Sequence, residues 1–308
     1  RGTITLNEVS MSAHTGTSED VLAYYARNWE KIANCYAVDQ GGLPIDPAWY
    51  RRRLYKEFLD RHKPASVLDI GCGGGWTVLD ALDSGADARG MEPVAELKEF
   101  GCKLLQQHGH DPRRIKQDDL ASVATLPERS EDCIALLSVL PHVPRERWDD
   151  VHRNMARLLR PGGRFIAAYR NELFDFYTFN SFTIEFYDKT LWNCQPCASL
   201  PSDDRVSLLK GLVTHPDMPG PYFTAAQDKS FGRLDRMKSN PLAMPAYLAQ
   251  FGLRVERTRY YHFHCVPPLI APAIAHYREV NHEMELTLSE DWRGNFMAAI
   301  FMVEAVRT

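Results

Sequence analysis

The sequence predicts an α/β fold, a doubly wound sheet of mostly parallel strands with helices on both faces. Short apolar runs alternate with helical stretches from Pro64 onward, which is the pattern of βαβ units. A glycine-rich turn at 71–75 follows the first apolar run. The alternation fails at 171–240, a span rich in aromatic residues and proline, and then resumes. We therefore expect one α/β domain that carries an insertion.

Composition and charge argue against several classes of protein. The chain has 308 residues, of which 44% are hydrophobic and 25% are charged, so it is long enough to bury a large core. No apolar run reaches the ~18 residues of a membrane span. A net charge of −4 provides no positive field for a phosphate backbone, and seven cysteines show no disulfide pattern. We expect a cytoplasmic protein that binds neither a membrane nor nucleic acid.

The first 63 residues are expected to hold an arm, at 1–17, and helices, at 18–63. The arm has no sustained period and begins with Arg rather than Met, as in a flexible segment or an expression remnant. The first helix is expected to begin at Ser18 and to end at Gly41. The second begins near Pro47, and its three consecutive arginines at 51–53 are predicted to form a solvated surface.

Residues 64–170 and 241–308 are expected to build one sheet of seven strands. The expected strands are Ser66–Gly71, Ala88–Met91, Arg114–Gln117, Asp132–Val139, Arg164–Tyr169, Leu253–Cys265 and Asn295–Arg307. Helices are expected at Thr77–Asp83, Val94–His108 and Trp148–Leu159. Residues 171–240 are too long for a plain connector and are predicted to form a lid over the substrate.

The strongest local signal is an apolar strand that runs into the glycine turn, from Val67 to Gly75. Glycine lets the chain turn sharply and lets a ligand approach the backbone at the carboxyl edge of parallel strands. A dinucleotide fingerprint needs a third glycine at the position of Trp76, and no P-loop Gly-Lys-Ser or Gly-Lys-Thr follows. These observations oppose a pyrophosphate or triphosphate ligand.

Acidic residues after the second and third strands indicate which groups of a ligand could bind there. Glu92 ends the second strand, where a carboxylate can accept hydrogen bonds from both hydroxyls of a ribose. Asp118 and Asp119 follow the third strand, where an acidic side chain can accept a hydrogen bond from an adenine amine. Together they predict a site for a nucleoside without phosphates.

Five segments occur in the order and spacing of one known family. They are Asp69–Gly75, Glu92, Gln117–Asp119, Ser138–Val143 and Leu158–Gly163. In these segments the sequence resembles the class I S-adenosylmethionine-dependent methyltransferases, which have a Rossmann-like fold. It is most similar to the small-molecule branch that includes ubiquinone and menaquinone biosynthesis enzymes. One departure is Pro141, where the family usually has Glu before His.

The resemblance implies S-adenosylmethionine as the cofactor and an antiparallel last strand in the sheet. It places the glycines at the methionine part, Glu92 at the ribose, Asp118 at the adenine amine and Ser138 beside the sulfonium. The residues expected at the cofactor are Asp69, Gly71, Cys72, Gly73, Gly75, Glu92, Pro93, Asp118, Asp119, Leu120, Ser138 and Val139.

Three histidines are candidate catalytic residues. His142 follows the fourth strand, where an imidazole can take a proton from the acceptor or can make a structural hydrogen bond in the turn; both alternatives stay open. Tyr260, His262 and His264 alternate along the sixth strand and are predicted to share one face at the active-site edge. Their alternative role is that of satisfied polar groups beneath the following loop.

The acceptor is expected to lie under a lid made by residues 18–45 and 171–240. Tyr25, a further catalytic candidate, and Tyr169 are expected near the transferred methyl, because aromatic faces suit a sulfonium cation. The candidate acceptor contacts are Tyr169, Arg170, Phe179 and Tyr260. No metal is expected, because Cys194 and Cys197 form a single C-x-x-C pair.

We expect an enzyme that transfers a methyl group to O or N of a small organic acceptor. The aromatic insertion favours a bulky acceptor, such as a natural product or a sugar-like molecule. Two alternatives are an NAD-dependent oxidoreductase on a related fold and a non-catalytic subunit that keeps the cofactor pocket. A homodimer is an arrangement that an apolar insertion would allow.

Overall fold

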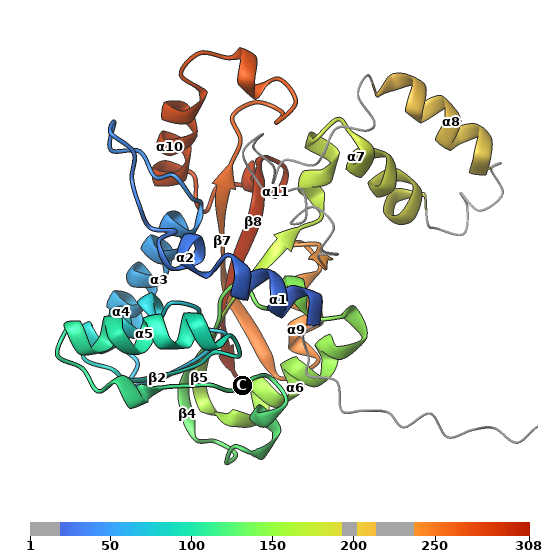
Figure 1. Ribbon diagram of the computed structural model, residues 1–308. Helices are drawn as coiled ribbons and strands as arrows, with labels where there is room; N and C mark the ends of the chain where they lie inside the picture. The colour runs from blue at the N-terminus through green and yellow to red at the C-terminus, as the bar shows by residue number, and fades with distance from the viewer. Residues whose placement is uncertain (1–18, 193–201, 214–236) are drawn as a thin grey trace, which may run out of the picture.

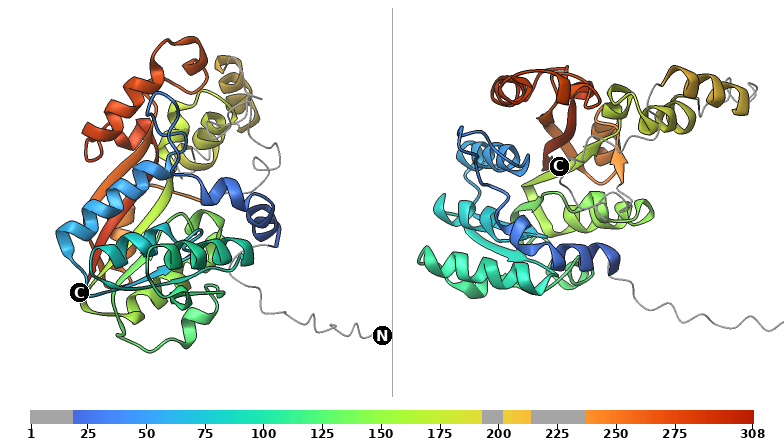
Figure 2. Two further views of the ribbon diagram at one scale, coloured as in Figure 1. Left: turned by 60° about the vertical axis from the view of Figure 1, so that its left-hand side comes forward. Right: turned by 45° about the horizontal axis from the view of Figure 1, so that its top comes forward.

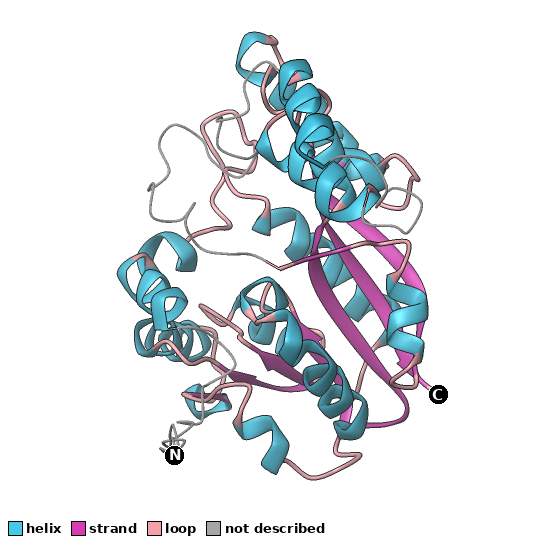
Figure 3. Ribbon diagram, turned by 90° about the vertical axis from the view of Figure 1, so that its right-hand side faces the viewer, coloured by secondary structure: helices cyan, strands magenta, loops and turns pink. Residues whose placement is uncertain are grey.

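The computed structural model describes residues 19–192, 202–213 and 237–308, and these residues form a twisted sheet with helices on both faces (Figure 1). The strands are β1 (Ser66–Ile70), β2 (Asp87–Met91), β3 (Ile115–Lys116), β4 (Glu131–Leu136), β5 (Leu159–Asn171), β6 (Lys238–Ser239), β7 (Leu253–Phe263) and β8 (Ala298–Arg307). Figure 3 shows the strands as a layer flanked by helices.

The main strands follow the order β3-β2-β1-β4-β5-β8-β7. β1 to β5 are paired in parallel, whereas β8 lies antiparallel between β5 and β7. The predicted fold class is confirmed, including the antiparallel last strand. The two-residue strand β6, which pairs with β5, was not predicted because so short a segment carries no readable alternation.

The helices lie mainly against the two faces of this sheet. The α-helices are α1 (Glu19–Arg27), α2 (Trp29–Ala33), α3 (Ala48–His62), α4 (Trp76–Asp83), α5 (Ala95–Gln107), α6 (Trp148–Leu158), α7 (Ser181–Phe186), α8 (Ser202–Leu212), α9 (Met244–Ala249), α10 (Tyr277–Thr287) and α11 (Gly294–Met297). Side chains of α3, α4 and α5 pack into one apolar cluster with the sheet, and side chains of α6 and α9 pack into another. The two clusters are the hydrophobic core on either side of the strands.

The first predicted helix is in fact two helices, and it ends earlier than predicted. The break is at Asn28, whose backbone has φ −111° and ψ 16°. The Asn28 side-chain amide donates to the Tyr24 carbonyl at 2.9 Å, a local bond of the kind that competes with helix formation. The second helix ends at Ala33, well before Gly41. The break lets α1 and α2 take different directions, and both contact α5.

The described part of the insertion lies to one side of the sheet. α7 and α8 contact each other, and α8 is the outermost helix of this region (Figures 1 and 2). Cys194 and Cys197 lie outside the described residues. No helix among the residues that the structure describes is both long and apolar enough to span a bilayer.

The carboxyl ends of six of the seven main strands meet at one edge of the sheet. β1, β2, β3, β4 and β5 point to this edge because they are parallel, and β7 does so because it and β5 both lie antiparallel to β8. Loops after parallel strands are where open α/β sheets bind ligands. The topology therefore places residues that are far apart in the sequence around a common site.

Candidate active site

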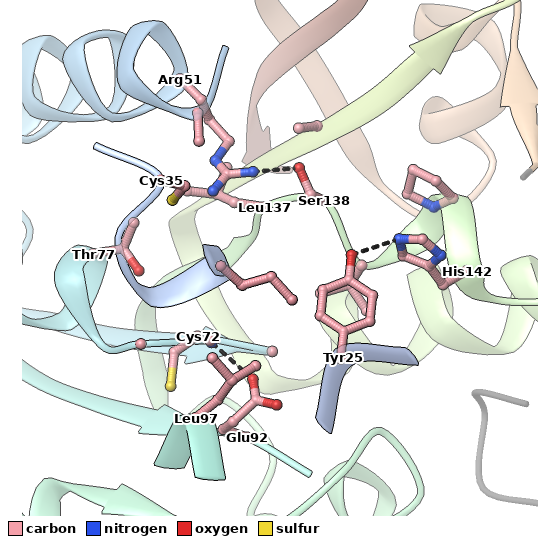
Figure 4. A pocket seen from close by; sticks show the side chains of 18 of the residues that line it. Tyr25, Cys35, Arg51, Cys72, Thr77, Glu92, Leu97, Leu137, Ser138 and His142 are labelled. Atoms are coloured by element: carbon pink, nitrogen blue, oxygen red, sulfur yellow. Dashed lines mark hydrogen bonds between the residues drawn. The ribbon is translucent and has the colours of Figure 1, made fainter. Parts of the chain in front are cut away.

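A cavity of about 310 Å³ lies at this edge of the sheet (Figure 4). Its floor comes from the loops after β1, β2, β3 and β4 and from the ends of β5, β7 and β8. Its cover comes from α1, α2 and the start of α3. None of the described residues of 171–192 and 202–213 lines it. Within the described chain, the cover over this cavity is therefore the N-terminal helices.

The glycine turn is shaped by backbone conformations that only glycine adopts easily. Gly71, Gly73 and Gly75 have φ values of +70°, +55° and +79°. A Cβ on Gly71 would stand 2.4 Å from Cγ2 of Val139, so this position has no room for a side chain. A Cβ on Gly73 would meet no atom within 4 Å, and Gly73 lines the cavity. Gly73 thus leaves open space where a ligand can approach the main chain.

Glu92 is held rigidly beside this turn. Its Oε2 accepts a hydrogen bond from the Gly73 amide at 2.7 Å, and its Oε1 accepts one from the Val94 amide at 3.0 Å. Burial raises the pKa of Glu92 to about 7, although these two amides oppose the rise. Each carboxylate oxygen has a second lone pair, so Glu92 can still accept two further hydrogen bonds from a ligand.

The other predicted cofactor residues divide between the cavity wall and its support. Those that line the cavity are Asp69, Gly71, Cys72, Gly73, Glu92, Pro93, Asp119, Leu120, Ser138 and Val139. Gly75 does not line it and instead precedes α4 as its N-cap. Asp118 does not line it either; its carboxylate accepts from the Asp119 amide at 3.0 Å. Asp119 is thus the one of these two acids that lines the cavity, and the contact of Asp118 with an adenine amine stays a prediction.

Asp69 is a buried acid whose role is partly structural. The Thr77 hydroxyl donates to Asp69 Oδ2, which ties the end of β1 to α4. Asp69 Oδ1 is buried and has no hydrogen-bond partner among the described residues. Burial raises the pKa of Asp69 to about 6. Its Oδ1 is thus a polar atom in the cavity wall that a ligand donor could satisfy.

Arg51 lines the cavity and is a candidate site residue that the sequence reasoning missed. The predicted solvated surface at 51–53 is wrong for this residue, because its guanidinium lines the cavity (Figure 4). Nη1 donates to the Ser138 hydroxyl at 2.6 Å and Nη2 to the Tyr36 hydroxyl at 3.5 Å. Nε is buried without a partner, and no carboxylate of the described residues lies within 4 Å of this guanidinium. Arg51 is therefore a cation ready to bind an anionic ligand group.

Tyr25 and His142 meet across the cavity. The Tyr25 hydroxyl lies 2.9 Å from Nε2 of His142, and the two rings are arranged edge to face at 5.4 Å. Both residues line the cavity, Tyr25 from α1 and His142 from the turn after β4 (Figure 4). Pro141 is buried directly before the histidine, in a short 3-10 turn. The two catalytic candidates are thus a hydrogen-bonded pair.

The predicted alternation along β7 is interrupted at its end. His262 has a left-handed backbone with φ +62°, so Tyr261 and His262 both line the cavity. Tyr260 does not; its hydroxyl donates to Asn295 at 2.8 Å, and its ring packs with the other apolar cluster. The His264 ring lies 4.9 Å from that of His262, tilted by 38°, and His264 does not line the cavity. The prediction that all three residues share one face is wrong for Tyr260.

The remaining acceptor candidates have different positions. Arg170 lines the cavity at the end of β5. Tyr169 is fully buried on the opposite face, where its hydroxyl lies 2.9 Å from Nε2 of His152. Phe179 is 49% exposed and does not line the cavity. The structure therefore keeps Arg170 as an acceptor candidate and contradicts the predicted place of Tyr169 near a transferred methyl.

Comparison with known proteins decides the class of this domain. Residues 68–167 match the family model described as methyltransferase domain. The chain is 33% identical over 113 residues to the ubiquinone biosynthesis O-methyltransferase of Xanthomonas oryzae pv. oryzae, which is 35% of this chain and 44% of that protein. Residues 68–167 form a class I methyltransferase domain.

Two further similarities set the limits of this assignment. The chain is 24% identical over 152 residues to the tRNA N(3)-methylcytidine methyltransferase trm140 of Schizosaccharomyces pombe, covering 46% of this chain and 48% of that protein. It thus spans less than half the length of these curated relatives. The magnesium protoporphyrin IX methyltransferase (ChlM) from Synechocystis PCC 6803, solved with bound SAH, shares the fold, with a TM-score of 0.52 and 14% identity over 94% of this chain and 98% of that chain.

The residues that line the cavity fit S-adenosylmethionine, the cofactor of this class. The fixed Glu92 carboxylate can accept from the ribose hydroxyls, and the open space above Gly73 admits a ligand beside the main chain. Asp119 can accept from the adenine amine. Arg51 can pair with the methionine carboxylate. No group of three or more His, Cys, Asp or Glu in the described chain could hold a metal ion.

The affinity of the methyltransferase domain for S-adenosylhomocysteine should rise with pH. The Glu92 carboxyl has a pKa of about 7, so it is mostly protonated at pH 6 and mostly ionised at pH 8. Ribose hydroxyls donate better to the ionised form, so we expect affinity to increase about ten-fold over this range. Calorimetric titrations at pH 6, 7 and 8 measure it. If the affinity of Glu92→Ala changed with pH by the same factor, the pH dependence would belong to another group.

A side chain at Gly73 should obstruct the cofactor without disturbing the core. We expect Gly73→Ala to weaken S-adenosylhomocysteine binding about ten-fold, because the new methyl enters the cavity. Gly85→Ala is the matched control: Gly85 has φ +93° and also has no atom within 4 Å of its missing Cβ, but it does not line the cavity. Equal affinities of the two variants would contradict the obstruction.

Proposed function

We propose that the protein transfers a methyl group from S-adenosylmethionine to O or N of a small organic acceptor. The observation that carries this proposal is a continuous cavity: Glu92, Gly73 and Arg51 lie along one part, and the Tyr25 and His142 pair lies along another. A bulky natural product or a sugar-like molecule is the acceptor we favour. The proposal places the reaction in the cytoplasm, and the free state of the five cysteines of the described residues supports this.

The residues of the chain can position the acceptor and remove its proton. Bound S-adenosylmethionine supplies a methyl group on a positively charged sulfur that an acceptor lone pair can attack. As the acceptor is methylated, its proton can pass to the Tyr25 oxygen while the Tyr25 proton passes to Nε2 of His142. α1 and α2 cover the cavity and keep water from competing.

Replacement of the Tyr25 hydroxyl tests this proton path. We expect Tyr25→Phe to lower kcat about ten-fold, a modest loss because positioning against an activated methyl contributes most of the acceleration. The pH-rate profile should also change in Tyr25→Phe, because the hydrogen bond between the Tyr25 hydroxyl and Nε2 of His142 is lost. An unchanged kcat and pH profile would show that the pair has only a structural role.

Two measurements test the proposed function against its alternatives. Calorimetric titration should show binding of S-adenosylhomocysteine and none of NADH; the reverse result would favour an oxidoreductase. Trp76 already opposes that alternative, because its indole donates to the Ala33 carbonyl at 2.9 Å where a third glycine would be needed.

Incorporation of label from methyl-labelled S-adenosylmethionine into a metabolite extract should give a small-molecule product. Total tRNA serves as a separate substrate, because a tRNA methyltransferase is among the relatives. Label in tRNA alone would overturn the small-molecule acceptor, and cofactor binding without any labelled product would favour a non-catalytic subunit.

A further inference from the structure

The charged side chains of the cavity are divided along the sheet. Of the described residues that line it, four are acidic, and three of these, Asp69, Glu92 and Asp119, lie on or directly after β1, β2 and β3. The fourth, Asp46, precedes α3 and accepts from the Ala48 amide at 2.8 Å. No acidic residue of the described chain lines the cavity from β5, β7 or β8. The half of the cavity over those strands therefore lacks the acidic side chains of the half over β1, β2 and β3, which we call the nucleoside half.

The half over β5, β7 and β8 contains Arg170. Neighbouring strands lie ~4.8 Å apart, and β4 lies between β1 and β5, so Arg170 is about 10 Å along the sheet from the glycine turn. Tyr261 and His262 line the same half from β7. Arg51, in contrast, bonds to Ser138 after β4, between the two halves. The two arginines thus serve different parts of the cavity.

The described side chains that line the cavity beside Arg170, Tyr261 and His262, can take part in hydrogen bonds to a ligand. Burial raises the pKa of Tyr261, while the charges of Arg51 and Arg170 oppose the rise. Burial, together with the charges of His264 and Arg170, holds the pKa of His262 well below its usual value, so His262 is neutral near pH 7. The Tyr261 hydroxyl is a neutral donor at this pH. A guanidinium beside a neutral tyrosine and a neutral histidine forms a cationic, hydrogen-bonding surface.

We infer that the acceptor carries an anionic oxygen group, a carboxylate or a phosphate, that binds Arg170 at the β5 and β7 side of the cavity. This rests on the proposed function and specifies its substrate class. The guanidinium fork binds such groups through paired hydrogen bonds, and Tyr261 and His262 can supply further ones. With Arg51 assigned to the cofactor carboxylate, Arg170 is the arginine that remains for the acceptor. An anion there would fix the distance of the reacting atom from Tyr25 and His142.

The test measures anion binding to the full chain saturated with S-adenosylhomocysteine, by ligand-observed NMR. The probes are benzoate, phenyl phosphate and the neutral benzamide. We expect at least one anion to bind about ten-fold more tightly than benzamide. Whichever of benzoate and phenyl phosphate binds more tightly indicates whether the acceptor carries a carboxylate or a phosphate. Equal binding of benzamide and both anions, or no binding of either anion, would overturn the inference.

Substitutions on β5 test whether the anion binds at Arg170. Arg170→Gln should weaken the bound anion about ten-fold and leave S-adenosylhomocysteine affinity unchanged. Arg164→Gln, the same change six residues earlier in β5 and outside the cavity, should leave both unchanged. If Arg170→Gln does not fold, Arg170→Lys should bind the anion several-fold more weakly, because a point charge replaces the fork. Undiminished anion binding in the folded Arg170 variant would overturn the inference.

Failure of the inference and failure of the proposed function give different results. A protein that does not bind S-adenosylhomocysteine contradicts the proposed function. The anion titration is then made on the protein alone, and its dependence on Arg170 still decides the inference. Normal S-adenosylhomocysteine binding with no preference for anions contradicts the inference only.

Discussion

Glu92→Ala is expected to weaken S-adenosylhomocysteine binding by at least about 100-fold, because hydrogen bonds to a charged group contribute about 1.5–3 kcal/mol each and two are lost. The carboxylate is already oriented by the Gly73 and Val94 amides, so the ligand does not have to immobilise it. Isothermal titration calorimetry measures the affinity.

Glu96→Ala is the matched control for Glu92→Ala. Glu96 is an exposed acid in the first turn of α5, four residues farther along the chain. The control variant should keep the wild-type affinity, and circular dichroism should show both variants folded. A Glu92→Ala protein that is folded and binds S-adenosylhomocysteine as the wild type does would show that the nucleoside lies elsewhere.

Arg51→Gln is expected to reduce S-adenosylhomocysteine affinity about 100-fold, because a buried carboxylate would lose its charged partner. The affinity for 5′-methylthioadenosine, which has the nucleoside and the sulfur but no carboxylate, should not change. The ratio of the two affinities therefore reports on the carboxylate contact alone. Arg51 suits this role because its Nε has no partner among the described residues and its Nη1 is fixed by Ser138.

Arg53→Gln is the control for Arg51→Gln. Arg53 is on the same helix but bonds to Glu57 and to the Glu285 carbonyl, away from the cavity. This variant should bind both ligands as the wild type does. If Arg51→Gln weakened both ligands equally, Arg51 would support the cavity wall rather than bind the carboxylate.

The sheet, and the place of the glycine turn and Glu92 at its carboxyl edge, could be predicted because their signals are local. A buried parallel strand is a short apolar run, and the glycine turn directly follows one. Glu92 is recognisable because it follows the second such run. Each of these signals needs only a few adjacent residues, and the topology then brings them together at one edge.

Arg51 was missed although a signal for it existed. Ala48, Arg51, Tyr55 and Phe58 follow helical spacing, so they share the buried face of α3. Three consecutive arginines hid this pattern, because their run looks like a solvated surface.

The errors at β5 and β7 have a different cause. Adjacent residues of a strand point to opposite faces, so Tyr169 and Arg170 could not both line the cavity. The pattern of β5, buried on both faces, does not tell which of the two does. On β7, the left-handed backbone of His262 shifts the alternation of side chains. Neither a histidine nor the residues beside it in the sequence predict that conformation.

The position of β8 has a consequence for how the protein is made. Ribosomes complete β5 and β7 before β8, yet β8 pairs with both of them inside the sheet. Until β8 emerges, the nascent chain has two unpaired strand edges, one on β5 near Arg170 and one on β7 near His262. Pairing between distant segments is slow, so the acceptor half should mature after the nucleoside half. A nascent chain would thus form the proposed nucleoside half of the cavity before the proposed acceptor half is complete.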